Sequence, residues 1–261
     1  MYELTYQSFM PDREEFYDNP DVRAKYSARR TQPDNPNETL ERPIFLELAG
    51  SLNQLDIIDL GCGDASFGKE ALLQGARSYI GIEASRAMVD LALAQLTNTS
   101  GKVHHERVEN WKAQSEQADL VSSRLALQYV ENLEPIFQEA YQALRPGGRM
   151  ILSVEHPVIT SNFASLAEGL RTTWLVNDYF KPGARMHQWL GHEVTKYHRT
   201  IEEYFNLVAT AGFQLERIRE SRPQPQNFSS QEEYKRRLRI PLFLFISARK
   251  SIHASPARDR T

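Results

Sequence analysis

Hydrophobic and polar positions follow two alternating periods through the middle of the chain. Apolar runs with the length of buried strands occupy residues 55–60, 78–83, 102–107, 118–123 and 149–154. Between these runs, apolar residues recur every three or four positions, as they do on one face of a helix. Strands and helices therefore alternate, which predicts a parallel sheet covered by helices on both faces.

One of the predicted helices can be bounded from its sequence. Over residues 132–145, Ile136, Phe137 and Ala140 share one face. Asn132 is a residue type that caps helix N-termini, and the Pro-Gly-Gly sequence at 146–148 is expected to end the helix.

The ends of the chain and one internal segment depart from this alternation. Residues 1–38 are polar and predict an N-terminal arm with short helices. Residues 158–198 have no sustained period and are rich in Trp, Tyr and His, so we interpret them as a cap inserted after the fifth strand. A helix at 200–211 and two further strands follow, and the tail at 251–261 is expected to be disordered.

Together these elements predict one α/β domain over residues 39–250, with the N-terminal arm before it. We expect a Rossmann-like, doubly wound and mostly parallel seven-stranded sheet with the cap at about 158–198. A chain of 261 residues is long enough to bury a full core of this kind.

Composition narrows the class of protein. The chain is 41% hydrophobic and 25% charged, which is typical of a soluble globular protein, and it has no run of about 18 apolar residues. A formal net charge of −3 argues against binding of nucleic acid by bulk electrostatics, and the basic run at 235–239 is interpreted as a solvated helix face. Cys62 is the only cysteine, which excludes an intrachain disulfide and a cysteine zinc cluster; no metal is expected. A cytoplasmic location fits these features best.

A glycine turn follows the first predicted strand. Gly61 and Gly63 let a ligand approach the backbone, and Asp59 places a carboxylate just before them. Ser66 stands where a dinucleotide fingerprint has its third glycine, and no Gly-Lys-Ser/Thr sequence is present. Glu83 ends the second strand, where a carboxylate can accept hydrogen bonds from ribose hydroxyls. A ligand with a ribose, no phosphate and a positive charge is expected, and S-adenosylmethionine fits that description.

These motifs resemble those of the class I S-adenosylmethionine-dependent methyltransferases of the small-molecule type. DLGCGDASFG resembles the glycine-rich first motif, with Ala65 in place of a third glycine, and IGIEAS, VENW, DLVSSRLALQYV and LRPGGRMILSVEHP resemble the motifs that follow it. The resemblance implies S-adenosyl-L-methionine as methyl donor and S-adenosyl-L-homocysteine as product. It implies that the cofactor contacts Tyr26, Arg30, Asp59, Gly61, Gly63, Glu83, Ala84, Met88, Glu109, Asn110, Ser123 and Gln128.

Within that set the resemblance gives several residues a specific role. Glu83 is the ribose acid, Met88 packs on the adenine, and Glu109 and Asn110 meet the adenine edge, although an aspartate is more usual at position 110. Gln128 stands where many family members have histidine. Tyr26 and Arg30 are expected to meet the methionyl carboxylate from the arm.

The acceptor is expected at the carboxyl end of the fifth strand, where His156 follows directly. Because imidazole titrates near ~6.5, His156 is the first candidate for a general base and His198 the second. The predicted cap supplies candidate substrate-binding residues Trp174, Tyr179, His187 and Trp189. These aromatic rings favour a flat or apolar small molecule.

Three functions remain open at this stage. The first is methylation of N, O or C in a small, aromatic or apolar metabolite by a monomer or homodimer, with no nucleic acid or membrane partner. The second is methylation of tRNA or protein; the acidic net charge and Ser122-Ser123-Arg124-Leu125 in place of an Asn/Asp-Pro-Pro-Tyr/Phe signature weigh against amino-group methylation of adenine or glutamine. The third is a non-catalytic module that binds the cofactor.

Overall fold

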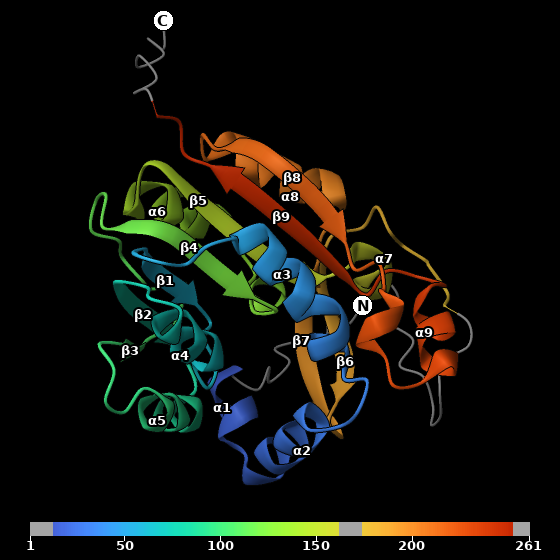
Figure 1. Cartoon of the computed structure of the whole chain (residues 1–261). Coiled ribbons are helices and arrows are strands. Elements are labelled where there is room, and N and C mark those ends of the chain that lie inside the picture. The colour runs from blue at the N-terminus through green and yellow to red at the C-terminus, as the bar shows by residue number, and fades with distance from the viewer. Residues whose placement is uncertain (1–12, 162–173, 253–261) are drawn as a thin grey trace, which may run out of the picture.

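The computed structural model describes residues 13–161 and 174–252, and its centre is a seven-stranded sheet (Figure 1). The strand order is β3-β2-β1-β4-β5-β9-β8, in which only β9 runs antiparallel to its two neighbours. The strands of this sheet are β1 (Asp56–Leu60), β2 (Ser78–Glu83), β3 (Lys102–His105), β4 (Ala118–Arg124), β5 (Leu144–Glu155), β8 (Gln214–Glu220) and β9 (Phe243–Arg249). The predicted mostly parallel, doubly wound sheet is confirmed.

Side chains that alternate along each strand fill two cores, one on each face of the sheet. On one face Ile57 and Tyr79 pack with helices α3 (Arg42–Ala49), α4 (Ser66–Leu73) and α5 (Arg86–Gln95). On the other face Ile58 and Ile82 pack with α6 (Glu134–Ala143) and α8 (Ile201–Thr210). The period of two in β1 and β2 thus separates the two cores, as expected of a sheet covered on both sides.

The boundary between α6 and β5 differs from the prediction. The helix ends at Ala143, and Pro-Gly-Gly at 146–148 lies within β5 instead of stopping the helix. The pairing of β4 with β5 shifts register between Ala118 and Leu120, next to this sequence, and Gly147 has φ of 82°. The Pro-Gly-Gly residues therefore lie in an irregular stretch at the start of β5 and not in a turn that ends the helix. Asn132 accepts a hydrogen bond from the Glu134 amide at 3.1 Å, close to its predicted capping role.

From residue 13 onward, the N-terminal arm forms two short helices, α1 (Arg13–Asp18) and α2 (Pro20–Arg30). Asp18 fixes the arm to the start of α5, because its Oδ1 accepts hydrogen bonds from Ser85 Oγ at 2.7 Å and from the Ala87 amide at 3.0 Å. A π-helical turn, η1 (Asn37–Glu41), then leads into α3. The arm is thereby positioned over the carboxyl ends of β1 and β2.

A separate hairpin follows β5. It consists of β6 (Gly183–Trp189) and β7 (His192–His198), preceded by the short helix α7 (Pro157–Thr160). Its residue Val194 packs with Phe16 and Val22 of the arm. The hairpin lies within the segment predicted as a cap; residues 162–173 of that segment, and 253–261 of the predicted tail, fall outside the described residues.

The remaining elements complete one end of the molecule. Two 3₁₀ turns, η2 (Leu127–Tyr129) and η3 (Pro225–Asn227), follow β4 and β8, and α9 (Gln231–Arg237) precedes β9. In Figure 1, α2, the β6–β7 hairpin and α9 gather beyond the arrowheads of β1 and β4. None of the helices in the two described ranges is long and apolar enough to span a bilayer.

Candidate functional site

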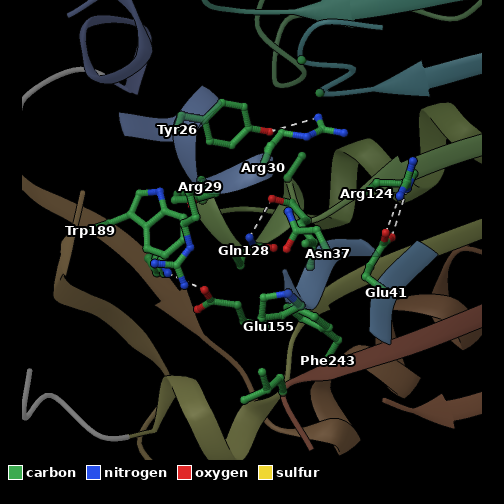
Figure 2. Close-up of a pocket in the computed structure, with 18 of the residues that line it drawn as sticks. Tyr26, Arg29, Arg30, Asn37, Glu41, Arg124, Gln128, Glu155, Trp189 and Phe243 are labelled. Atoms are coloured by element: carbon green, nitrogen blue, oxygen red, sulfur yellow. Dashed lines mark hydrogen bonds and ion pairs between the residues drawn. The ribbon is translucent and has the colours of Figure 1, made fainter. Parts of the chain in front are cut away.

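A cavity of about 600 Å³ opens where the carboxyl ends of β1, β2, β4 and β5 meet the arm, the hairpin and α9. This is the edge at which open parallel sheets bind ligands. Figure 2 shows Tyr26 and Arg30 on one side of the cavity, the Arg124–Glu41 pair on another, and Glu155 with Trp189 across from them.

The glycine turn after β1 forms one wall. Gly61 and Gly63 have φ of 72° and 57°, in the left-handed region that other residues rarely adopt. The Gly61 and Cys62 amides both donate to the carbonyl of Ile82, at 2.8 and 3.1 Å, which ties the turn to β2. A Cβ placed on Gly63 would meet no atom within 4 Å, so the turn leaves open space beside the backbone.

Glu83 is held at the end of β2 by backbone amides. Its Oε2 accepts a hydrogen bond from Gly63 N at 2.8 Å and its Oε1 accepts one from Ser85 N at 2.9 Å. The side chain is 6% exposed and lines the cavity. Because each carboxylate oxygen has a second lone pair, both oxygens can still accept a bond from a ligand hydroxyl.

Asp59 also reaches the cavity but is engaged within the protein. Tyr79 Oη donates to its Oδ2 at 2.8 Å and Ser122 Oγ donates to its Oδ1 at 2.7 Å. Burial raises the pKa of Asp59 despite these two hydrogen bonds. The sequence prediction of a carboxylate in the turn is thus met by a side chain that also joins β1 to β2 and β4.

A buried ion pair that the sequence did not predict lies beside the turn. The guanidinium of Arg124 forms a bidentate pair with the Glu41 carboxylate, in which Nε and Nη2 each donate to one oxygen. The same carboxylate accepts a hydrogen bond from Ser153 Oγ at 2.7 Å. The same guanidinium lies 5.0 Å from the centre of the Phe45 ring. Burial acts against the charge of Arg124, but the Glu41 carboxylate outweighs it and raises the pKa above the ordinary value. The pair fixes η1 against β4 and β5.

Tyr26 and Arg30, the two residues of the arm that were predicted to meet the cofactor, line the cavity. Arg30 Nη1 lies 3.5 Å from Tyr26 Oη and 3.6 Å from Asp64 Oδ2. Burial raises the pKa of Tyr26, so its hydroxyl stays protonated and can donate. The arm therefore presents a hydroxyl and a guanidinium opposite the glycine turn.

The far side of the cavity contains a second ion pair. Lys196 of β7 lies 2.5 Å, Nζ to Oε1, from Glu155 at the end of β5. Burial acts to raise the pKa of Glu155, but Lys196 outweighs that effect and lowers it. Lys196 also faces the rings of Tyr129 and Trp189, at 5.7 and 5.5 Å from their centres.

The basic run at 235–239 is not entirely a solvated helix face. Arg236 and Arg237 line the cavity, with side chains only 15% and 10% exposed, and both contact Glu233, at 2.5 and 2.7 Å. Lys235 and Arg239 in the same run are exposed, as predicted. The sequence predicted a helix with a basic run, but not that two arginines of this run are buried against the cavity.

Neither histidine predicted as a general base lies in the cavity wall. The ring of His156 is 2% exposed; its Nδ1 accepts from the Val158 amide at 3.2 Å and its Nε2 lies 3.0 Å from Glu220. His198 is fully buried, with Nδ1 2.7 Å from Thr160 Oγ1 and Nε2 2.8 Å from the carbonyl of Tyr179. Both rings therefore join elements of the fold, and neither His156 nor His198, the two candidate bases, is among the residues that line the cavity.

The remaining predicted site residues divide into two sets. The cavity is lined by Tyr26, Arg30, Asp59, Gly61, Gly63, Glu83, Met88, Gln128, Trp174, His187 and Trp189. Five other predicted residues do not line it: Ala84, Glu109, Asn110, Ser123 and Tyr179.

Each of those five is placed elsewhere for a local reason. Ser123 is buried and donates to the Leu60 carbonyl, and Tyr179 packs edge-on against His198. The carbonyl of Ala84 accepts a hydrogen bond from Nε2 of His105 at 2.8 Å, and Asn110 is exposed to solvent. Glu109 lines a separate cavity of about 370 Å³ next to Tyr197.

Sequence reasoning also missed several lining residues, namely Tyr17, Arg29, Glu41, Arg124, Tyr129, Lys196, Arg236, Arg237, Leu242 and Phe243. The basic run was the one signal that could have identified two of them. The others depend on how the arm, the hairpin and α9 fold over the strand ends.

Comparisons with known proteins agree with this geometry. A family model described as a methyltransferase domain matches residues 58–152. The solved structure of an S-adenosylmethionine-dependent methyltransferase from Mesorhizobium loti is similar at a TM-score of 0.75, with 31% sequence identity over 80% of this chain and 97% of that one. An uncharacterized protein of Haemophilus influenzae is 30% identical over 253 residues, 90% of this chain and 96% of that protein. A trans-aconitate 2-methyltransferase from Variovorax paradoxus is 29% identical over 143 residues, 53% of this chain and 49% of that protein.

The matched domain model extends from β1 into β5, and so covers the glycine turn and Glu83. The similarity to the Mesorhizobium enzyme continues over most of the chain. The methyl donor is accordingly S-adenosylmethionine, as the resemblance implied. This chain belongs to the family of S-adenosylmethionine-dependent methyltransferases.

Proposed function

We propose that this enzyme transfers a methyl group from S-adenosylmethionine to a small acceptor molecule bound in the same cavity. The observation that carries the proposal is the continuity of that cavity. One volume of about 600 Å³ contacts both the glycine turn with Glu83 and the distant wall formed by Glu155, the hairpin and α9. This volume is in the size range of small-ligand sites, and the arm, the hairpin and α9 cover the cavity.

The residues near β1 and β2 fit the donor. Glu83 is held by two backbone amides and retains lone pairs for the two ribose hydroxyls. Met88 is buried and lines the cavity, where it can pack on the adenine. Tyr26 and Arg30 supply donors for the methionyl carboxylate. The buried Oε1 of Gln128 has no hydrogen-bond partner in the described structure, and it can accept one from the methionyl ammonium.

Methyl transfer from a sulfonium requires little of the protein beyond the positioning of the two reactants. The sulfonium supplies an activated methyl group: a lone pair of the acceptor forms the new bond to the methyl carbon, and the electron pair of the broken carbon–sulfur bond stays on sulfur. The enzyme must hold the acceptor atom in line with that bond and exclude water. Since His156 and His198 lie outside the cavity wall, neither is proposed as a base.

The acceptor side combines rings and charges. Trp174, Trp189 and Phe243 line it and favour a molecule with a planar or apolar part. The cations of the hairpin and α9 do not favour an acceptor that is apolar throughout. The Variovorax relative, whose name specifies trans-aconitate, supports a small-molecule acceptor; it matches about half of this chain.

The proposal is tested by release of S-adenosylhomocysteine. Wild-type enzyme is incubated with S-adenosylmethionine and either the dialysable or the non-dialysable fraction of a cell extract. We expect release with the dialysable fraction, and little with that fraction when Glu83→Ala is used. Release confined to the non-dialysable fraction, and lost after RNase or protease treatment, would instead favour methylation of tRNA or protein. Release with neither fraction would favour a non-catalytic module.

A further inference from the structure

Three guanidinium groups line the acceptor side of the cavity. Arg29 comes from α2, and Arg236 and Arg237 come from α9. The two arginines of α9 share Glu233. Within the described ranges, no carboxylate forms an ion pair with Arg29, whose guanidinium instead lies 4.6 Å from the centre of the Trp189 ring. This side of the cavity therefore carries more positive than negative charge.

Arg237 has the least exposed side chain of the three arginines. Its side chain is 10% exposed, and its Nε is buried with no hydrogen-bond partner in the described part of the chain. Burial lowers the pKa of Arg237, and the charges of Arg236 and Arg29 lower it further, which places the three groups in one electrostatic cluster. A buried N–H without an acceptor costs free energy unless a ligand supplies one.

The other carboxylates nearby are already engaged. Glu155 is paired with Lys196 at 2.5 Å, and Glu41 is held by Arg124. Glu155 also attracts Arg29, since each of the two groups shifts the pKa of the other, but Lys196 has the larger effect on Glu155. Glu155 and Glu233 together leave two of the four positive charges of Lys196, Arg29, Arg236 and Arg237 unbalanced, and a bound anion can balance them.

We propose that the methyl acceptor is a small acid whose carboxylate or phosphate group binds between Arg29 and the Arg236–Arg237 pair. A guanidinium presents its donors in a planar fork that matches the oxygens of either group. The rings of Trp189 and Phe243 flank the rest of the molecule. This inference rests on the proposed function, because it names the substrate class of the same cavity.

The charge of the acceptor can be tested before its identity is known. The dialysable extract is passed over an anion-exchange resin at neutral pH, and each fraction is supplied to the enzyme with S-adenosylmethionine. We expect acceptor activity in the fraction retained by the resin and eluted by salt. Activity in the flow-through alone would overturn the acidic acceptor while leaving the methyltransferase function intact; no activity in any fraction would overturn both. Treatment of the retained fraction with phosphatase distinguishes a phosphate from a carboxylate.

Variants then test the cluster itself, with the active fraction as substrate. Arg29→Gln and Arg237→Gln should each raise the apparent KM about tenfold or more, because a charge-assisted hydrogen bond is lost. The control is Lys235→Gln, an exposed residue of the same helix, which should leave KM unchanged. Calorimetry should show wild-type affinity for S-adenosylhomocysteine in all three proteins. An unchanged KM in both arginine variants, or a matching loss of S-adenosylhomocysteine affinity, would contradict the assignment; Arg29 is exposed, so its variant is expected to fold.

Discussion

Lys196 and Glu155 join the hairpin to the central sheet at the wall of the cavity. Nζ of Lys196 lies 2.5 Å from Oε1 of Glu155, and the lysine side chain is only 4% exposed. The pair holds β7 against the carboxyl end of β5, so the wall formed by His187 and Trp189 depends on it.

Removing the lysine should therefore destabilise the protein. Lys196→Met leaves the Glu155 carboxylate largely buried without its cation, a change that typically costs about 3–5 kcal/mol. Urea denaturation at neutral pH measures the loss. Lys181→Met is the control, because Lys181 is 75% exposed in its pair with Asp178, and it should change stability by less than about 0.5 kcal/mol.

The same variants have a defined pH dependence. In the wild type the pKa of Glu155 lies below its ordinary 4.5, so its stabilising contribution is complete above pH 4.5 and is lost as the pH falls through the lowered pKa. In Lys196→Met, burial is the largest remaining influence and should raise that pKa against the weaker attraction of His187 and Arg29, so that protonation relieves the penalty in acid. The stability gap between the two proteins should narrow on acidification. A gap that widens would contradict this account of the pair.

Asp18 gives a second prediction, on the arm. Asp18→Ala removes the acceptor for Ser85 Oγ and the Ala87 amide, so residues 13–30 should exchange amide hydrogens faster. Affinity for S-adenosylhomocysteine should fall with it, since Tyr26 and Arg30 lose their position. Asp90→Ala removes an exposed carboxylate of α5 and serves as the control. Equal exchange in the two variants would show that Asp18 does not anchor the arm.

The histidines are predicted to act on stability instead of turnover. Burial lowers the pKa of both His156 and His198 below 6.5, so the unfolded chain binds protons near that pH that the folded chain does not. Stability should thus be complete well above pH 6.5 and fall as the pH drops through it, and His156→Gln and His198→Gln should each flatten this dependence. His156→Ala should keep kcat within a few-fold of wild type. A hundredfold fall in kcat in a folded variant would restore His156 as a base.

Ligand selectivity gives a fourth prediction. S-adenosylhomocysteine should raise the melting temperature, with stabilisation of about 2.7 kcal/mol at a hundredfold excess over its dissociation constant. NADH and ATP should not, because Ser66 and the carboxylates of Asp59 and Glu83 leave no phosphate site at the glycine turn, where the phosphates of a nucleotide would be held. A shift with NADH but none with S-adenosylhomocysteine would contradict the assignment of the glycine turn.

The sequence predicted the features that depend on local pattern. Strands β1 and β2 were bounded to within a residue, because their apolar runs end at the glycine turn and at Glu83. Because parallel strands end at the same edge of a sheet, the sequence also predicted that Gly61, Gly63 and Glu83 lie at one edge. Their positions could be predicted without knowing how the arm or the hairpin folds.

The cavity wall formed by the arm, the hairpin and α9 could not be predicted in the same way. His156 directly follows β5, but it caps α7 and points to Glu220, and sequence position alone does not fix that direction. Arg237 belongs to a run that looks solvated, and only the docking of α9 buries it. Arg29 and Lys196 converge from α2 and β7, which are separated by more than 160 residues.

The central claim is that Glu83 binds the ribose of S-adenosylmethionine in this cavity. Calorimetric titration with S-adenosylhomocysteine of the wild type, Glu83→Ala and the surface control Asp90→Ala tests it most directly. The loss of charge-assisted hydrogen bonds, each worth roughly 1.5–3 kcal/mol, predicts that Glu83→Ala raises the dissociation constant at least tenfold, while Asp90→Ala leaves it unchanged. A dissociation constant for folded Glu83→Ala equal to that of the wild type would contradict the claim.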